Sequence, residues 1–213
     1  MIRDSGQVDD RPWDERWDER YSAAEFDPAR PPSQVVEAEL GDLPPGRALD
    51  LAAGAGRHTI WLAQRGWRVT AVDFSRVGLD RGRRLSAVRG VPGPQVDWVQ
   101  ADLSDYRPEP GAYQLALISY LQSTPEVRSA ALAAAAAALA PGGTVLVLGF
   151  DLANLTEGTG RPSNPDVLYT PEAVCAALPG LRILRAERIR RDVHTATGLK
   201  TSVDTVVRAV RDP

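Results

Sequence analysis

The sequence predicts an α/β fold built on a doubly wound, mostly parallel sheet. From residue 33 onward, short apolar segments with strand character alternate with helical segments, which is the pattern of a parallel sheet with helices on both faces. Near the C-terminal end, two strand-like runs at 181–193 and 199–210 are joined by a short connector. A parallel crossover needs about a dozen residues, so this last pair is expected to form an antiparallel hairpin.

Each expected element is bounded by residues that start or stop it. The first helix ends at Gly41, and the alanine-rich helix follows Thr124, a good N-cap, with Pro125 at its first position. The alanine run is expected to be helical because alanine is the best helix former. We expect strands over residues 47–52, 67–72, 96–100, 113–119 and 144–150. We expect helices over residues 34–40, 57–65, 77–89 and 125–139, and a short helix from Pro171.

The N-terminal segment carries a repeat, Trp-Asp-Glu-Arg, which begins at Trp13 and again at Trp17 and is followed by Tyr21. On a helix, this spacing puts the three aromatic rings on one stripe. Like charges four residues apart do not stabilise an isolated helix, so the stripe is expected to dock on another part of the chain. For residues 12–32 two interpretations remain open, a helix packed on the core and a lid over a ligand cleft. Residues 1–11 are polar and are expected to form a disordered tail.

Composition limits the class of protein. The 213 residues suit one α/β domain, which we place at residues 12–213. The net charge of −3 argues against a nucleic-acid-binding protein. Cys175 is the only cysteine, so neither an internal disulfide nor a multi-cysteine metal site is possible, and no metal is expected. The chain lacks a run of about 18 apolar residues and an apolar signal core, so we expect no membrane span and a cytoplasmic location.

A glycine-containing loop follows the first expected strand. Gly54 and Gly56 let a ligand approach the backbone, and the next helix offers free N–H groups at its start. A dinucleotide-binding loop would have glycines where Ala52 and Thr59 stand. The strand instead ends with Asp50, whose carboxylate would repel a pyrophosphate but can bind the cationic amino group of a methionine moiety.

Acidic residues also follow the second and third expected strands. Asp73 stands about 20 residues after the glycine loop, where a carboxylate accepts hydrogen bonds from ribose hydroxyls. Phe74 beside it can pack against adenine, and Asp102 can accept from the exocyclic amine of adenine. Alternatively, Asp73 is a helix N-cap and Asp102 a turn residue. Acids at the tips of three consecutive strands favour the ligand-binding interpretation.

These features resemble the class I S-adenosylmethionine-dependent methyltransferases, whose signature is a glycine loop led by an acid, followed by acids after the second and third strands. More narrowly, nearly the whole chain resembles the tellurite-resistance-type and related small-molecule methyltransferases. The motifs that carry this resemblance are Trp17-Asp18-Glu19-Arg20-Tyr21, Leu49-Asp50-Leu51, Gly54-Ala55-Gly56-Arg57, Val72-Asp73-Phe74-Ser75, Pro141-Gly142-Gly143 and Leu168-Tyr169-Thr170-Pro171-Glu172.

The resemblance implies a Rossmann-like, doubly wound, seven-stranded sheet with an antiparallel last strand. It implies S-adenosylmethionine as the cofactor and S-adenosylhomocysteine as the product, with Tyr21 covering the cofactor and Asp73 binding its ribose. We expect cofactor contacts from the following residues: Tyr21, Asp50, Ala52, Gly54, Gly56, Arg57, Asp73, Phe74, Ser75, Asp102, Leu103 and Ser119.

The fourth strand and the C-terminal hairpin bear on the acceptor. Nucleic-acid and glutamine N-methyltransferases of this class carry an Asn/Asp/Ser-Pro-Pro-Tyr/Phe motif at this position. This chain has Ser-Tyr-Leu-Gln there, at residues 119–122, so a small-molecule acceptor is expected. Tellurite-type proteins carry a His-Arg pair and a further arginine near the last strand. Here the pair is His194-Thr195 and the second base is Lys200, which argues against tellurite itself.

The expected reaction is in-line displacement at the sulfonium methyl, which depends mainly on alignment and exclusion of water. Candidate catalytic residues are His194 and Tyr120, while His58 is expected to be a solvated first-turn residue. Candidate substrate-binding residues are Trp17, His194, Lys200 and Tyr169. The loop at residues 151–168 is a possible active-site lid or a disordered insertion. A catalytically silent S-adenosylmethionine-binding protein and an NAD-dependent oxidoreductase remain as alternatives, and the chain is expected to be a monomer or a homodimer.

Overall fold

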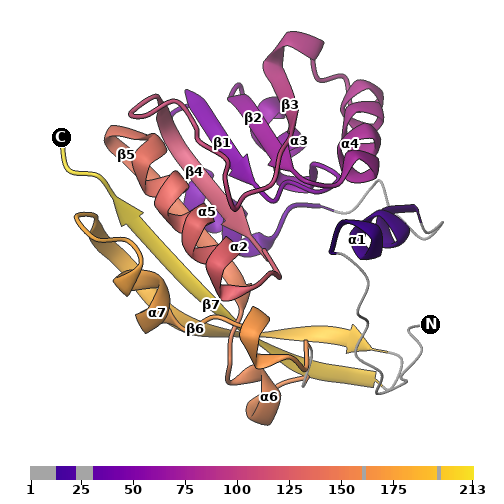
Figure 1. Cartoon of the computed structure of the whole chain (residues 1–213), viewed down its shortest axis with the longest axis vertical. Helices are drawn as coiled ribbons and strands as arrows, with labels where there is room; N and C mark the ends of the chain where they lie inside the picture. Colours follow the sequence, from indigo (N-terminus) through magenta and orange to yellow (C-terminus); the bar gives the residue numbers. More distant parts are fainter. Residues whose placement is uncertain (1–12, 23–30, 160–161, 196–197) are drawn as a thin grey trace.

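The computed structural model describes residues 13–22, 31–159, 162–195 and 198–213, and in these ranges it contains one seven-stranded sheet (Figure 1). The expected tail at residues 1–11 lies outside the described residues. The strands are β1 (Arg47–Leu51), β2 (Arg68–Asp73), β3 (Val96–Gln100), β4 (Tyr113–Ser119), β5 (Leu139–Phe150), β6 (Arg182–Thr195) and β7 (Gly198–Val210). The helices are α1 (Trp13–Ser22), α2 (Gln34–Leu40), α3 (Arg57–Gln64), α4 (Arg76–Val88), α5 (Pro125–Ala138), α6 (Asn154–Glu157) and α7 (Pro171–Ala176).

The strand order confirms the predicted fold class. The strands run in the order β3-β2-β1-β4-β5-β7-β6, with parallel pairing from β3 to β5 and antiparallel pairing of β7 with both β5 and β6. Most expected elements are present within a few residues of their predicted bounds. The main differences are that β5 begins at Leu139, before the predicted start, and that the loop after it contains the short helix α6.

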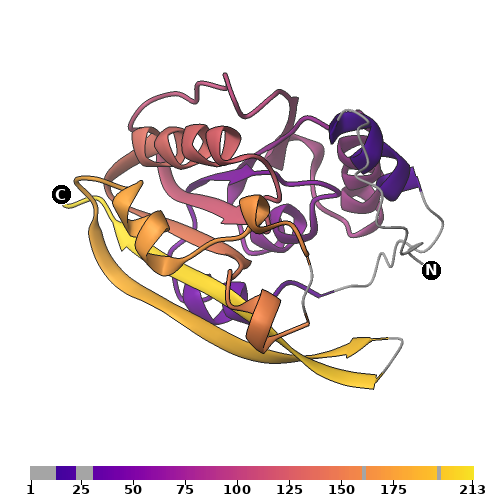
Figure 2. The same cartoon turned by 60° about the horizontal axis from the view of Figure 1, so that its bottom comes forward.

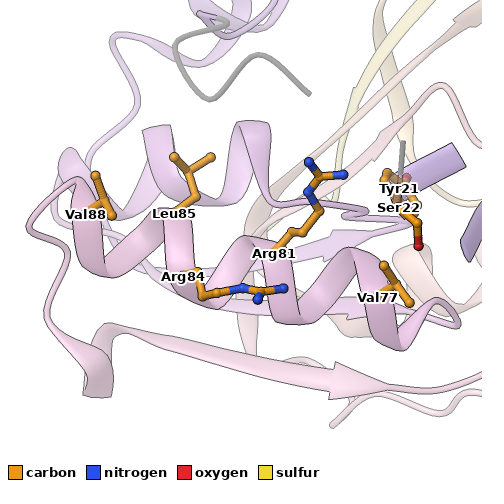
Figure 3. A pocket seen from close by; sticks show the side chains of 7 residues that line it. All are labelled: Tyr21, Ser22, Val77, Arg81, Arg84, Leu85 and Val88. Atoms are coloured by element: carbon orange, nitrogen blue, oxygen red, sulfur yellow. The ribbon is translucent and has the colours of Figure 1, made fainter. Parts of the chain in front are cut away.

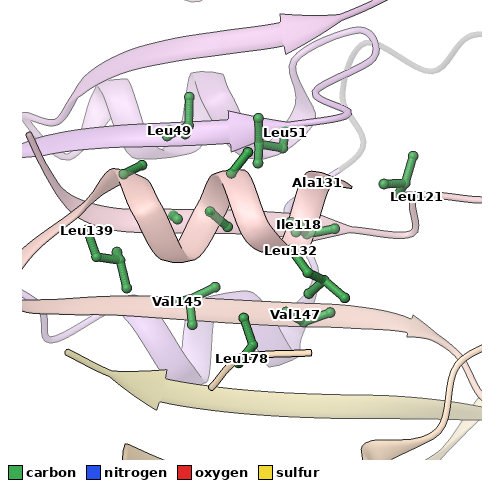
Figure 4. Packing of buried hydrophobic residues seen from close by; sticks show 14 of the residues in the cluster. Leu49, Leu51, Ile118, Leu121, Ala131, Leu132, Leu139, Val145, Val147 and Leu178 are labelled. Carbon is green, nitrogen blue, oxygen red and sulfur yellow. The ribbon is translucent and has the colours of Figure 1, made fainter. Parts of the chain in front are cut away.

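Hydrophobic side chains fill both faces of the sheet. Figure 4 shows Leu49, Leu51 and Ile118 of the central strands packed under α5, and Val145 and Leu178 belong to the same cluster. The other face packs against α2 and α3 through a second cluster. The small alanine side chains of α5 let this helix lie close to the strands. Removing one of these buried leucine side chains would cost about 2 to 5 kcal/mol, so the two clusters fix the strand tips rigidly.

The connections create a switch point between β1 and β4. The chain moves outward from β1 to β2 and β3, and then crosses back so that β4 pairs with the other side of β1. In open α/β sheets, ligands bind at the carboxyl ends of the strands where the order reverses. In Figure 1, α1 lies beside α4 near this edge of the sheet.

The β6–β7 hairpin extends beyond the rest of the sheet. Pairing between β5 and β7 ends at Phe150 and Asp204, whereas β6 and β7 pair as far as Thr195 and Gly198. Figure 2 shows the free end of this hairpin projecting past the other strands. None of the described helices is both long enough and apolar enough to cross a membrane.

Candidate active site

The loop after β1 depends on left-handed backbone conformations. Ala52, Gly54 and Gly56 have φ values of 64°, 55° and 75°. The ring of Trp98 lies so close to Gly56 that a Cβ there would overlap it, so this position needs glycine for space as well as for φ. Ala52, which stands where a first glycine was expected, adopts the conformation at a cost of about 1 to 2 kcal/mol. The loop keeps the shape of a glycine loop despite this substitution.

Asp73 holds this loop in place. Its carboxylate is buried and accepts hydrogen bonds from the backbone N–H groups of Gly54 and Ser75, at 2.8 and 2.9 Å. Burial raises the pKa of Asp73 to about 6, against the lowering effect of these two N–H donors. The N-cap of α4 is Ser75, whose hydroxyl accepts from the N–H of Gly78, so the N-cap interpretation of Asp73 is wrong. A carboxylate offers about four acceptor positions, which leaves Asp73 capacity for ligand hydroxyls.

Asp50 is a second buried carboxylate, at the neighbouring strand. Asp50 is 2% exposed, and one of its carboxylate oxygens accepts from the Thr59 hydroxyl at 2.6 Å. Burial raises the pKa of Asp50 to about 7, the Thr59 hydrogen bond lowers it, and the charge of Asp73 raises it further. Thr59 thus donates a hydrogen bond to Asp50, and it stands at the position where a dinucleotide-binding loop would have its third glycine. No basic side chain in the described segments forms an ion pair with either carboxylate, so a cationic ligand would stabilise both.

Helix α1 docks on the glycine loop through Tyr21. A Cβ at Gly54 or Gly78 would overlap or crowd the Tyr21 ring, which places this ring between the loop and the start of α4. Burial, and then the charge of Asp73, raises the pKa of Tyr21 well above its usual value. The Trp17 ring stacks on Tyr21 with 5.6 Å between centroids. The helix is therefore packed on the domain, and its expected role in covering the cofactor stays a prediction. The side chain of Trp13 lies outside what the structure describes.

A second contact fastens the same helix. The Ser75 hydroxyl donates to the carboxylate of Asp18. Figure 3 shows Tyr21 and Ser22 at one end of an open cavity of about 620 Å³ that runs along α4 from Val77 to Val88. This cavity lies along the outside of α4 and does not include the buried carboxylates.

The other expected cofactor residues differ in their burial and in their local contacts. Phe74 is half-buried and Leu103 is buried. Asp102 is exposed and accepts from the N–H of Ser104 at 2.8 Å, which is the arrangement of a turn residue. Arg57 donates from Nε to the carbonyl of Pro31 at 2.5 Å. The expected contacts of these residues with the cofactor stay predictions.

The tip of β4 carries two candidate residues. The hydroxyl of Ser119 is buried and has no hydrogen-bond partner within the described ranges. Tyr120 has a φ of 56°, a strained conformation that is uncommon outside glycine, and its hydroxyl donates to Asp204 at 2.8 Å. Asp204 is completely buried and forms an ion pair with Arg191. Sequence reasoning missed both Arg191 and Asp204, although an acid between Val203 and the apolar run 206–207 was a visible signal.

His194 and Lys200 are exposed on the projecting hairpin. His194 pairs with Leu199, and Val193 pairs with Lys200. Because residues directly opposite each other share a face and successive residues alternate, the two candidates lie on opposite faces of the hairpin. The two side chains therefore lie on opposite sides of the hairpin, and the expected contact of each with substrate stays a prediction.

Two further expectations differ from the structure. His58 is buried and its Nε2 accepts from the N–H of Ser33 at 3.3 Å, so the expectation of a solvated first-turn residue is wrong. Tyr169 is also buried, in the cluster under α5, and its hydroxyl donates to the carbonyl of Leu121 at 2.7 Å. A ring enclosed in this way is not exposed to a ligand, which argues against its expected contact with substrate.

The start of the predicted lid at residues 151–168 is anchored to β7. Asp151 is completely buried and accepts from the hydroxyl of Thr205 at 2.5 Å and from Nε of Arg188 at 2.9 Å. The side-chain oxygen of Asn154 accepts from the N–H of Val203 at 3.1 Å. Residues 160–161 lie outside the described ranges. The segment has defined structure near β5, and its role as a lid stays a prediction.

Comparison of the sequence with known families agrees with this geometry. Residues 48–143, which include the glycine loop and both buried carboxylates, match a family described as a methyltransferase domain. A demethylmenaquinone methyltransferase of Clavibacter sepedonicus is 35% identical over 105 residues, which cover 49% of this chain and 41% of that protein. The chain thus matches less than half the length of the curated relatives, 41% in one and 15% in another.

Solved structures share the whole fold. The N-methyltransferase NodS from Bradyrhizobium japonicum WM9, determined with S-adenosylhomocysteine, superposes with a TM-score of 0.71 at 16% identity, covering 94% of this chain and 98% of that one. TehB from Haemophilus influenzae superposes with a TM-score of 0.68 at 13% identity, covering 93% and 67%. At these identities the likeness establishes the fold alone.

Proposed function

We propose, from the premise that this chain carries a class I S-adenosylmethionine-dependent methyltransferase domain, that it transfers a methyl group to a small-molecule acceptor by in-line displacement. The observation that carries the proposal is the pair of buried carboxylates, Asp50 and Asp73, at adjacent strand tips. Burying two acids without a cation is costly, so their place in the fold indicates a cationic ligand.

The residues present fit this ligand. We propose that Asp73 accepts hydrogen bonds from the ribose hydroxyls and that Asp50 lies toward the amino group of the methionine moiety. Gly54 and Gly56 let the loop adopt its left-handed backbone, and Tyr21 and Trp98 fill the space where a Cβ would lie at these positions. Tyr21 covers the loop, Phe74 packs against adenine, and Asp102 accepts from its amine. Bound S-adenosylmethionine supplies an electrophilic methyl group on a sulfonium.

The contribution of the chain to catalysis is alignment and exclusion of water. The reaction starts from a positive sulfonium and disperses that charge, so little new charge has to be stabilised. The docked helix α1, with Tyr21 and Trp17, limits access of water to the loop. Ser119, whose buried hydroxyl has no partner among the described residues, is proposed to contact the ligand at the tip of β4. Holding two reactants in line is worth many orders of magnitude in rate.

Tyr120 and His194 have different proposed roles. Burial, and then the charge of Asp204, raises the pKa of Tyr120 well above its usual value, so its hydroxyl keeps its proton. We propose that Tyr120 orients the acceptor and does not act as a base. We propose that His194, which is exposed on the hairpin face opposite Lys200, contacts an anion and does not act as the base.

The alternatives are a catalytically silent binding protein and an NAD-dependent oxidoreductase. The second is disfavoured because Ala52 and Thr59 replace two glycines of the dinucleotide loop and because Asp50 would repel a pyrophosphate. Isothermal titration with S-adenosylhomocysteine and NAD separates these cases, since we expect binding of the first and none of the second. Binding of NAD alone would refute the proposal.

The same titration tests the role of Asp73. Asp73→Asn should weaken the affinity for S-adenosylhomocysteine by about tenfold or more, because hydrogen bonds to a charged acceptor are worth about 1.5 to 3 kcal/mol. The control is Asp97→Asn, which removes an exposed acid from the neighbouring strand β3 and should leave the affinity unchanged. Transfer of a labelled methyl group to a metabolite panel then distinguishes the enzyme from a silent binding protein. Equal affinity in wild type and Asp73→Asn would contradict the site.

A further inference from the structure

We infer that one face of the β6–β7 hairpin, together with the tip of β4, forms an acceptor site for an aromatic carboxylate. We name as the acceptor face the residues Tyr120, Phe150, Arg191 and Lys200. The inference rests on the proposed function, because it names the class of acceptor that the methyl group would reach. It goes beyond that function by assigning a binding role to residues of β5, β6 and β7.

Two aromatic rings form the floor of the acceptor face. The rings of Tyr120 and Phe150 contact each other with centroids 4.8 Å apart and an interplanar angle of 51°. Tyr120 directly follows β4, at the switch point where ligands bind in this type of sheet. The guanidinium carbon of Arg191 lies 5.7 Å from the Tyr120 ring and 6.0 Å from the Phe150 ring. The rings and the cation therefore meet at one corner.

A buried carboxylate fixes this corner. Asp204 is completely buried, and it accepts from the Tyr120 hydroxyl, from Arg191 and, at 3.2 Å, from the Ser202 hydroxyl. The Nη2 atom of Arg191 also donates to the Ser202 hydroxyl at 3.3 Å. Because Nε and Nη2 are used in this way, the guanidinium plane is held while its side chain stays 34% exposed. Nη1 of Arg191 has no acceptor in the part of the chain that the structure describes.

A second cation lies on the same face. Arg191 pairs with Ser202, and Val193 pairs with Lys200, so Arg191 and Lys200 are diagonal neighbours on one face of the antiparallel pair. Diagonal neighbours of this kind are about 7 to 8 Å apart, within reach of long side chains. Lys200 is exposed and forms no ion pair with any described residue. With Asp204 neutralising one of the two cations, the acceptor face carries one net positive charge.

This combination matches one chemical class. A guanidinium held in a plane recognises a carboxylate through its parallel N–H donors, and an exposed ammonium adds a second contact. A tilted pair of aromatic rings packs best against a planar apolar group. An acceptor with a carboxylate on an aromatic ring satisfies both features. The opposite face of the hairpin differs, because Arg190 there is already paired with Glu157.

The test uses the full chain saturated with S-adenosylhomocysteine and three probes, which are benzoate, its neutral isostere benzamide, and inorganic phosphate. Binding is measured by titration into the millimolar range. We expect benzoate to bind about tenfold more tightly than either other probe, since a charge-assisted pair and a ring contact are each worth about 1 to 2 kcal/mol. Failure of benzoate to bind, or binding no tighter than benzamide or phosphate, would overturn the inference.

Variants assign the contacts to named residues. Lys200→Ala and Arg191→Lys should each weaken benzoate binding by about threefold to tenfold and leave benzamide binding unchanged. Both changes keep the fold, because Lys200 is exposed and a lysine still pairs with Asp204. The matched control is Arg190→Ala, which removes the same charge from the adjacent position on the other face. An equal effect of Arg190→Ala would show a general field effect and refute the site.

The inference and the proposed function fail in different ways. If wild-type protein does not bind S-adenosylhomocysteine, the proposed function fails whatever the probes do. If it binds S-adenosylhomocysteine but not benzoate, only the acceptor class fails. The affinity for S-adenosylhomocysteine should be the same in Lys200→Ala as in wild type, because this residue lies on the hairpin and outside the glycine loop.

Discussion

The affinity for S-adenosylhomocysteine should depend steeply on pH, because both carboxylates of the site are protonated more easily than usual. Burial raises the pKa of Asp73 to about 6 and that of Asp50 to about 7. A protonated Asp73 is a poorer acceptor for ribose hydroxyls, and a protonated Asp50 loses its attraction for an ammonium group. Lowering the pH from 7 to 5 therefore removes the binding-competent form of the protein.

The size of the effect follows from the two pKa values. Below its pKa, each carboxylate loses ionised population about tenfold per pH unit. From pH 7 to pH 5 the affinity should fall by about tenfold if only Asp73 matters, and by several hundredfold, about 3 to 4 kcal/mol, if both must be ionised. Over this range the amino group of the ligand keeps its proton, since α-amino groups have pKa values of about 7.7 to 8.0.

Titration calorimetry at several pH values, in two buffers of different ionisation enthalpy, measures both the affinity and the protons released. We expect proton release on binding near pH 6. In Asp50→Asn the pH dependence should shrink to the roughly tenfold contribution of Asp73. A wild-type affinity that stays constant between pH 5 and pH 7, without proton release, would refute the assignment of these carboxylates to the ligand.

Three other predictions concern stability. Ala52→Gly should stabilise the protein by up to about 1 kcal/mol in urea unfolding, because relief of the left-handed strain exceeds the entropy cost of glycine; a loss of stability would contradict this. Tyr120→Phe should cost about 1 to 3 kcal/mol because buried Asp204 loses a donor, and an unchanged urea midpoint would argue against that hydrogen bond. The free protein should lose stability as the pH rises from about 4 to 7, since Asp50 up to about pH 7 and Asp73 up to about pH 6 are ionised in the unfolded chain and protonated in the folded one; Asp50→Asn should reduce this slope and leave the part due to Asp73, and an unchanged slope in the variant would contradict it.

The sheet and the placement of the two carboxylates at neighbouring strand ends were predictable because their signals are local. Strand periodicity, the stop at Gly41 and the cap at Thr124 define elements over a few residues each, and the parallel arrangement follows from their alternation. Asp50 and Asp73 were predictable in the same way, since each ends a strand and the ends of parallel strands share one edge. Their hydrogen bonds to Thr59 and to the loop N–H groups were not predictable, because these depend on how the loop folds back.

The proposed acceptor face depends on contacts between parts of the chain that are far apart in the sequence. Tyr120 and Asp204 are separated by 84 positions, and no local pattern pairs them. His58 was expected to be solvated because it lies in the first turn of a helix, but it accepts from the N–H of Ser33, 25 positions away. The register of the hairpin decides on which of its faces His194 and Lys200 lie, and a shift of the register by one residue would move a strand's side chains to the other face. Tertiary packing therefore decided each result that differed from expectation.

The free end of the β6–β7 hairpin has a consequence for the evolution of specificity. Beyond Arg190 and Val203, which still contact Glu157, Asp151 and Asn154, the backbone of each described strand residue pairs with the other strand alone, so this arm unfolds locally at a smaller free-energy cost than the central sheet. Amide protons between Gly198 and Thr201 should exchange sooner than those of β1 or β4. On the proposed assignment, substitutions in this arm change the contacts with the acceptor and leave the glycine loop intact, as is usual where binding residues lie on segments carried by a rigid scaffold.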